Sequence, residues 1–218
     1  PLEVAYAAHR IETEVLHQQS GIQDQLCAAY GGINYIEMFQ YPYAAVSQIQ
    51  VSNPVWWELE RRLCLVFLGR SHSSPAVHER VIRNIREEGP EYHQLEVLRD
   101  CARASRDAVY AGDLVGLGAA MVRNTEAQRS LHPSLVSREA EQLIEIAREH
   151  GALGWKVNGA GGEGGSVTFL CGPSMSTKRA MVRDIEATNP LYQNIPIYLS
   201  RYGLRVWEAP LGSTGIGC

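Results

Sequence analysis

The chain has 218 residues, of which 45% are hydrophobic and 20% are charged, a composition typical of a globular protein with a sizeable core. Its formal net charge of −4 argues against a surface for nucleic acid or anionic membranes. The five cysteines form no Cys-x-x-Cys pair, so we expect reduced thiols in a cytoplasm, with neither a disulfide scaffold nor a zinc site. No apolar run approaches the roughly 20 residues of a membrane-spanning helix.

Helical patterns open the chain and strand patterns follow them. A break at Ser20-Gly21 separates two helical patterns, and Asn53-Pro54 marks a turn that we take as a boundary between lobes. The elements expected before this boundary are helices over Leu2–Leu16 and Ile22–Tyr30 and strands over Ile33–Phe39 and Ala44–Val51. The apolar face expected for the first helix consists of Val4, Ala8, Ile11 and Val15.

Beyond the boundary the pattern is that of a mixed α+β fold, which we expect to be a two-layer α/β sandwich. A short apolar run predicts a buried strand, and a serine before proline predicts a helix start at Ser74-Pro75. The further helices are expected over Tyr92–Tyr110, Asp113–Ser130, Arg138–His150 and Ser176–Thr188. The strands are expected over Leu63–Leu68, Lys156–Asn158, Val167–Leu170, Ile195–Leu199 and Leu204–Trp207.

A glycine-dense segment, Lys-Val-Asn-Gly-Ala-Gly-Gly-Glu-Gly-Gly, occupies residues 156–165 between two strand patterns. Glycines without a Cβ let backbone amides crowd around an anion, which is one way in which proteins bind phosphate. The alternative is a tight hairpin turn whose glycines serve only positive φ angles.

Together with this loop, an upstream motif resembles the GHMP small-molecule kinases. The pattern Gly-x-Gln-Asp-Gln from Gly21 to Gln25, and then Gly-Gly-x-Asn-x-Ile-Glu from Gly31 to Glu37, is similar to the D-glycero-D-manno-heptose 7-phosphate kinase branch. So are Arg129-Ser130-Leu131-His132-Pro133 and Gly151-Ala152-Leu153-Gly154. The resemblance implies a remnant of the N-terminal lobe over residues 1–54, a ferredoxin-like GHMP C-terminal domain over 55–208, and a tail over 209–218.

This resemblance implies a phosphotransferase that uses ATP and Mg²⁺ to phosphorylate an alcohol group of a sugar or sugar phosphate. Asp24 matches the catalytic aspartate of the family, and a carboxylate that accepts the hydroxyl proton makes a poor nucleophile reactive. The alternative for Asp24 is an acid placed at a helix N-terminus to suit the helix dipole.

The resemblance also assigns binding roles. Arg70 precedes the expected helix start, where an anionic sugar substituent could bind, although His72 replaces the family's arginine and a plain N-cap run remains the alternative. The histidines show no metal-ligand spacing. The substrate-binding residues are expected to be Gly21, Gln23, Arg70, Ser71 and His72. The nucleotide or phosphate loop is expected to be Lys156, Asn158, Gly159, Ala160, Gly161, Gly162, Gly164 and Gly165, with Glu163 interrupting it.

Family members carry a Pro-x-x-x-Gly-Leu-Gly-Ser-Ser-type loop upstream of the aspartate, and nothing similar stands between Pro1 and Asp24. We therefore expect this chain alone to bind ATP poorly and to be inactive, as a fragment, as one half of a two-chain kinase or homodimer, or as a degenerate descendant. Two other functions stay open: a non-catalytic sugar-sensing or scaffolding homologue, and a different α+β enzyme that uses the loop for a nucleotide or acyl phosphate.

Overall fold

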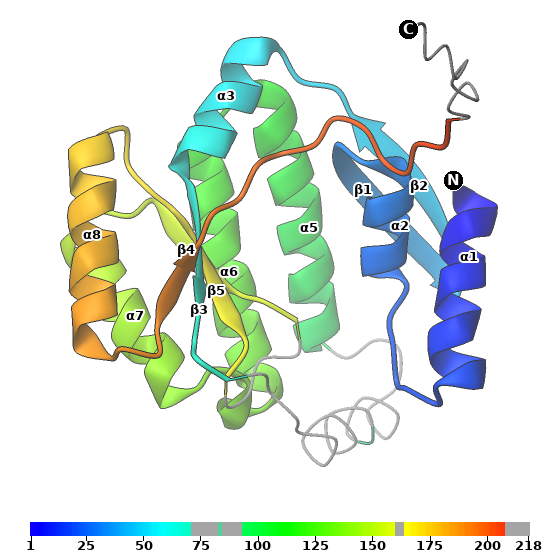
Figure 1. Cartoon of the computed structure of the whole chain (residues 1–218), viewed down its shortest axis with the longest axis horizontal. Coiled ribbons are helices and arrows are strands. Elements are labelled where there is room, and N and C mark those ends of the chain that lie inside the picture. Colours follow the sequence, from blue (N-terminus) through cyan, green and yellow to red (C-terminus); the bar gives the residue numbers. More distant parts are fainter. Residues whose placement is uncertain (71–82, 84–92, 160–163, 208–218) are drawn as a thin grey trace, which may run out of the picture. The chain divides into compact units, whose positions relative to one another are not determined.

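The computed structural model describes residues 1–70, 83, 93–159 and 164–207. Within these residues the chain forms two compact units, residues 1–49 with 199–207, and residues 50–198. Both units combine helices with antiparallel strands (Figure 1), so the expected α+β class is confirmed. The expected domain scheme stays a prediction, and the helix start at Ser74-Pro75 lies outside the described residues.

The first unit packs two helices on a two-stranded sheet. Strand β1 pairs with β2 in antiparallel fashion, and Ile36 lies opposite Val46 in this register. The elements are α1 (Leu2–Arg10), a π-helical turn (Ile11–Val15), α2 (Gln23–Tyr30), β1 (Ile33–Gln40) and β2 (Tyr43–Ile49). The buried core of the unit consists of Ala5, Ile22, Leu26, Ala29 and Ala44.

The apolar face expected for the first helix is wrong. Its last two residues, Ile11 and Val15, are 53% and 67% exposed, whereas Ala5 and His9 are buried. The His9 ring nitrogen Nε2 lies 2.9 Å from the hydroxyl of Tyr41, so a polar contact satisfies the buried ring. A prediction from hydrophobic periodicity counts only apolar residues. It therefore leaves out the buried His9 and places the buried face on neighbouring positions of the helix.

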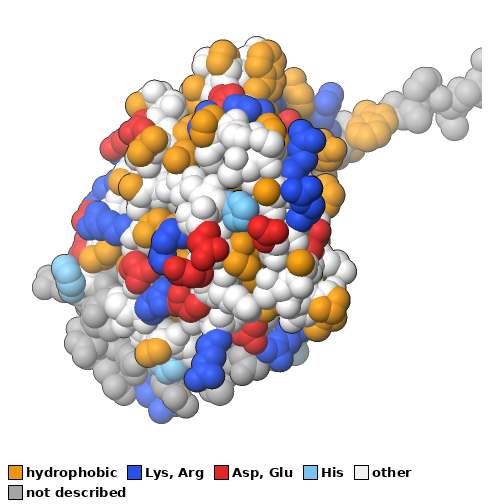
Figure 2. All heavy atoms as spheres, turned by 90° about the vertical axis from the view of Figure 1, so that its left-hand side faces the viewer, with side chains coloured by type: hydrophobic (Ala, Val, Ile, Leu, Met, Phe, Trp, Pro, Cys, Tyr) orange, Lys and Arg blue, Asp and Glu red, His pale blue; other side chains and the backbone are white. Residues whose placement is uncertain are grey.

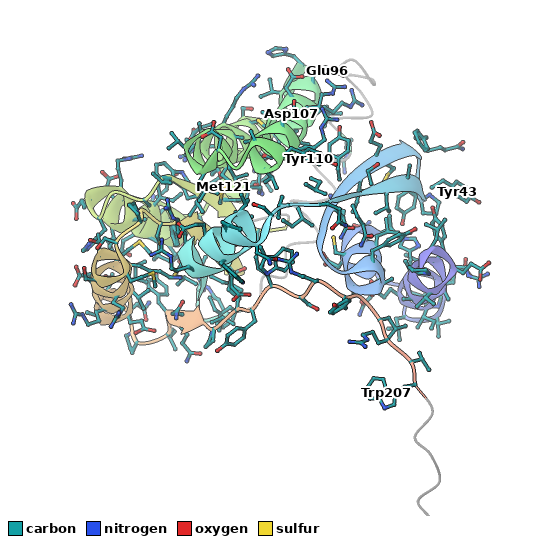
Figure 3. The ribbon with its side chains drawn as sticks, turned by 90° about the horizontal axis from the view of Figure 1, so that it is seen from above. Tyr43, Glu96, Asp107, Tyr110, Met121 and Trp207 are labelled. Atoms are coloured by element: carbon teal, nitrogen blue, oxygen red, sulfur yellow. The ribbon has the colours of Figure 1, made fainter. Side chains whose placement is uncertain are left out.

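The strand expected over Leu204–Trp207 is also wrong, since these residues belong to no strand of the described chain. The Leu204 amide instead donates to the carbonyl of Ala29 at the end of α2, at 3.3 Å. A Cβ at Gly203 would lie 2.1 Å from the same carbonyl oxygen, so the chain can pass here only as glycine. Nearby, Trp207 projects from this extended segment (Figure 3) and is 78% exposed.

The second unit carries a four-stranded antiparallel sheet in the order β4-β5-β3-β6. The strand expected over Ile195–Leu199 lies earlier in the chain and is shorter, since β6 spans Gln193–Ile195. The helices are α3 (Asn53–Arg62), α5 (His93–Ala111), α6 (Leu114–Leu131), a 3-10 turn (Pro133–Leu135), α7 (Arg138–Glu149) and α8 (Met175–Thr188). The strands are β3 (Leu63–Phe67), β4 (Gly154–Val157), β5 (Ser166–Leu170) and β6 (Gln193–Ile195).

The core of this unit lies between the sheet and α7 and α8. Its fully buried side chains include Val66 and Phe169 from the sheet, Leu143 from α7 and Met181 from α8. Helices α5 and α6 form a neighbouring antiparallel pair (Figure 1), in which Tyr110 lies on α5 and Met121 on α6 (Figure 3).

Acidic and basic side chains are interspersed on the face of the molecule shown in Figure 2. Several of the described charges in the second unit are paired, as Arg148 is with Glu145 and Arg129 with Glu141. The four cysteines in the described ranges are free thiols. None of the helices described is long and apolar enough to cross a membrane.

Candidate active site

Asp24 lies in the first turn of α2 and is exposed. The start of the helix is held by the core, because Ile22 and Leu26, two residues before and after Asp24, are fully buried. No side chain caps this helix start, so Asp24 is not its N-cap residue, although a first-turn acid still suits the helix dipole. Asp24 faces a cavity of about 370 Å³, which is lined by Val4, Ala5, Ala8, Glu12, Asp24, Gln25, Ala28, Ala29 and Leu204.

A hydrogen-bonded cluster fixes the chain just before Asp24. Ser20 Oγ donates to Glu12 Oε2 at 2.5 Å, and Gln25 Nε2 donates to the same oxygen at 2.7 Å. The hydroxyl of Tyr41 donates to the carbonyl of Ser20 at 2.9 Å. The bonds from Ser20 and then from Gln25 hold the pKa of the Glu12 carboxyl below its usual value. The turn that carries Asp24 is therefore held on both sides.

The glycine-rich segment is the connection of a hairpin between β4 and β5. Gly159, Gly164 and Gly165 have φ angles of 60°, 92° and 78°, which favour glycine. The Gly165 amide donates to the carbonyl of Arg70 at 2.8 Å, and a Cβ at Gly164 would lie 2.4 Å from that oxygen. These two glycines therefore serve the close approach of two backbones. Ala160, Gly161, Gly162 and Glu163 lie outside the described residues.

Asn158 closes the base of the same hairpin. Its Nδ2 donates to Ser166 Oγ at 2.9 Å and to Thr168 Oγ1 at 3.0 Å. Its backbone amide donates to the carbonyl of Ser166 at 3.0 Å. The side chain thus fixes the two strand ends from which the loop leaves.

Lys156 lies half-buried at the root of the loop. Burial disfavours the charged form and lowers the pKa of Lys156 to about 8. Its ammonium donates to Gln128 Oε1 at 2.6 Å and to the carbonyl of Val157. Gln128 Nε2 in turn donates to the carbonyl of Gly159 at 3.0 Å. One buried amide on α6 therefore contacts both the lysine and the first glycine of the loop.

Arg70 follows β3 and forms an ion pair with Glu139 at 2.8 Å. Its carbonyl receives the Gly165 amide, so the chain after β3 lies against the end of the glycine loop. An anionic ligand at Arg70 would compete with Glu139 for the guanidinium. Ser71 and His72, and with them the alternative of an N-cap run, lie outside the described residues.

The expected site residues fall into two groups, each within one unit. Gly21, Gln23 and Asp24 share the start of α2 in the first unit. The described loop residues and Arg70 share one end of the sheet in the second unit. Across the residues described, no group of three or more histidine, cysteine, aspartate and glutamate side chains could hold a metal ion. Mg²⁺ usually needs only one or two carboxylates beside phosphate oxygens, and Glu12 and Asp24 line the same cavity.

Sequence reasoning missed Glu12, Ser20 and Gln128 as parts of this arrangement. A signal for Gln128 existed, because Thr125 and Gln128 continue the inward face of α6 that includes Gly118, at helical spacing. Buried polar residues on such a face need partners, and here the partners come from β4 and its loop. No comparable periodicity marks Ser20.

Residues 105–183 match a family model described as GHMP kinases C terminal. This segment is therefore similar to the C-terminal domain of GHMP kinases, and the resemblance expected from the motifs is confirmed. The chain is 25% identical over 172 residues to the D-glycero-alpha-D-manno-heptose 7-phosphate kinase of Campylobacter jejuni, an alignment that covers 79% of this chain and 50% of that protein. The chain thus spans about half the length of this curated relative.

Solved structures of sugar and small-molecule kinases share the fold. One is a D-glycero-D-manno-heptose 1-phosphate kinase from Bacteroides thetaiotaomicron, with a TM-score of 0.63 and 21% identity over 94% of this chain and 55% of that chain. Another is the mevalonate kinase of L. major in complex with R-mevalonate, with a TM-score of 0.65 and 24% identity over 84% of this chain and 54% of that chain. The likeness shows that this chain shares its fold with about half of each of these two kinases.

Proposed function

We propose that this protein acts as an ATP-dependent kinase on a sugar phosphate of the heptose phosphate class. The observation that carries the proposal is Asp24, which lies in the first turn of α2 and lines a cavity together with Glu12. The GHMP C-terminal match and the 25% identity to a heptose 7-phosphate kinase support the reaction and the substrate class.

In the proposed reaction, Asp24 is the general base. Its carboxylate accepts the proton of the acceptor hydroxyl as that oxygen bonds to the γ-phosphorus of ATP, the bond from phosphorus to the bridging β–γ oxygen breaks, and ADP leaves. Proton acceptance by a positioned carboxylate contributes on the order of 10²–10⁴-fold in rate. The bonds that Glu12 makes with Ser20 and Gln25 hold the turn of Asp24 in place.

ATP and Mg²⁺ belong to the proposal. Mg²⁺ would neutralise phosphate charge, and Glu12, which lines the same cavity as the base Asp24, would hold it. The family resemblance assigns Lys156 and the glycine loop to the phosphates, and Gly21, Gln23 and Arg70 to the sugar. The roles of Ser71, His72, Ala160, Gly161 and Gly162 rest on the family resemblance alone.

The test is whether the protein phosphorylates D-glycero-D-manno-heptose phosphates, and the reaction is measured by the release of ADP. The chain is assayed alone and co-expressed with a segment that supplies the upstream phosphate loop, since we expect little turnover without it. Asp24→Asn should slow turnover by roughly 10²–10⁴-fold, while Asp107→Asn on α5 (Figure 3), an equally conservative change at an exposed acid, should not slow it. Turnover by Asp24→Asn near the rate of the unsubstituted protein would refute the assignment.

One observation favours the alternative of a non-catalytic sugar-sensing or scaffolding homologue. The Gly165 amide donates to Arg70, and the Lys156 ammonium donates to Gln128 and Val157, so these donors already have partners within the protein. Calorimetry separates the two functions. A sensor would bind the sugar phosphate without ATP and release no ADP, whereas a kinase would turn over when both ligands are present.

A further inference from the structure

Helix α6 runs along the edge strand β4 at very close range. A Cβ at Gly118 would lie 2.3 Å from the carbonyl oxygen of Leu153, and one at Gly154 would lie 2.3 Å from that of Gly118. From Gly118 to Gln128 the helix advances about 15 Å. From Gly154 to Gly159 an extended chain advances about 17 Å. Helix α6 thus contacts this part of the chain at Gly118 and again at Gln128, which lies where β4 ends and the glycine loop begins.

Side-chain donors occupy alternate carbonyls along the open edge of β4. Strand β5 pairs with the other edge, so every second carbonyl of β4 points away from the sheet. Thr125 Oγ1 donates to the carbonyl of Trp155 at 3.1 Å, and Gln128 Nε2 donates to that of Gly159 at 3.0 Å. Between them, the Lys156 ammonium donates to the carbonyl of Val157. The outward carbonyls of β4 therefore all have side-chain donors, and this pattern of bonding continues past the end of the strand to Gly159 in the loop.

Gln128 uses both ends of its amide at this point. The side chain donates to the Gly159 carbonyl and accepts from the Lys156 ammonium at 2.6 Å, and the residue is only 6% exposed. We propose that Gln128 is a positioning residue of the glycine-rich loop, which fixes the chain direction at Gly159 and holds the Lys156 ammonium at the loop's root for a phosphate-bearing ligand. The inference rests on the proposed function, because it assigns this ligand to the same loop.

The charge of Lys156 gives the arrangement a pH dependence. Burial lowers the pKa of Lys156 to about 8, and no charged side chain of the described residues contributes to that shift. On β5 the residue opposite in register is the neutral Thr168. On α6 the charged neighbours of Gln128 are Glu126 and Arg129, which pair with each other, and Arg129 also pairs with Glu141 on α7. Affinity for a phosphate-bearing ligand should therefore fall as the pH rises through about 8.

The test measures ADP binding with Mg²⁺ by calorimetry, on both sides of the Lys156 pKa, with the protein co-expressed with a segment that supplies the upstream phosphate loop. Gln128→Leu should weaken ADP binding about tenfold, since it removes both bonds. Thr125→Val is the matched control, because it removes a buried bond to β4 on the same face of α6 without touching the loop. Gln128→Glu should shift the pH midpoint of binding upward, since a carboxylate beside the ammonium raises its pKa. An unchanged midpoint would show that the Lys156 ammonium takes no part in ligand binding, and the proposed role of Gln128 in holding it for the ligand would be wrong.

If Gln128→Leu binds ADP as tightly as Thr125→Val does, the positioning role is wrong and the proposed function stands. If the unsubstituted protein does not bind ADP, the proposed function fails, and hydrogen exchange decides the positioning role without ligand. The protected amides of Asn158 and Gly165 should then exchange faster in Gln128→Leu than in Thr125→Val. Equal exchange in the two variants would overturn the inference.

Discussion

Replacing Gly118 with alanine should destabilise the protein, although the change removes a glycine from the middle of a helix. In an open helix this substitution gains about 1 kcal/mol. At position 118, however, the new Cβ would lie 2.3 Å from the carbonyl oxygen of Leu153 and 2.6 Å from its carbonyl carbon. Both are backbone atoms of the residue before β4, so α6 must move away from the strand.

The size of the effect follows from these two opposing terms. Overpacking costs about 1–3 kcal/mol, and a contact this short against backbone belongs at the upper end. After the gain in helix propensity, the net loss is roughly 2 kcal/mol. For a chain of this length such a loss lowers the melting temperature by about 4–8 °C.

The assay is thermal and urea unfolding, with Ala119→Gly as the control. Ala119 is the exposed neighbour on the same helix, so its replacement by glycine should cost only about 1 kcal/mol and calibrates the propensity term. If Gly118→Ala is as stable as the unsubstituted protein, or more so, then the close approach of α6 to β4 is wrong. The geometry from which the role of Gln128 is inferred would fail with it.

Two further predictions concern pH. The pKa of Glu12 is depressed by bonds from Ser20 and Gln25, so their stabilising effect is present above pH 4.5 and is lost as the pH falls through the folded value. In Ser20→Ala, the Glu12 carboxyl measured by carbon NMR should titrate closer to 4.5, and an unmoved titration would contradict the cluster. The pKa of Lys156 is lowered from 10.5 to about 8, so the cost of its buried charge is present below pH 8 and is relieved up to pH 10.5. Over that interval the unfolding free energy should rise relative to Lys156→Met, and a constant difference would count against the burial of the charge.

Much of the fold could be predicted where apolar periodicity is strong. Helix α7 was expected over Arg138–His150 and spans Arg138–Glu149, because a clear apolar stripe follows Ser137, whose side chain caps the helix. Short elements were harder. Strand β6 has only three residues, and its pairing with β3 decides its position more than its own composition does.

The candidate site could be predicted only in part. Asp24 and the glycine loop were found because their motifs resemble a known family. Gln128 was not, because its partners Lys156 and Gly159 lie 28 and 31 residues further along the chain. Only the alignment of α6 with β4 brings them together, and no local pattern encodes that alignment. The same holds for Glu12, whose partners Ser20 and Gln25 follow a change of chain direction.

Phosphorus NMR of ATP and Mg²⁺ with a D-glycero-D-manno-heptose phosphate tests the kinase assignment most directly. The protein, co-expressed with a segment that supplies the upstream phosphate loop, should produce ADP and one new phosphoester signal. Asp24→Asn should slow both by roughly 10²–10⁴-fold, and Asp107→Asn should leave them unchanged. If ADP and the phosphoester appear as fast with Asp24→Asn as without it, Asp24 is not the base and the proposed mechanism is contradicted.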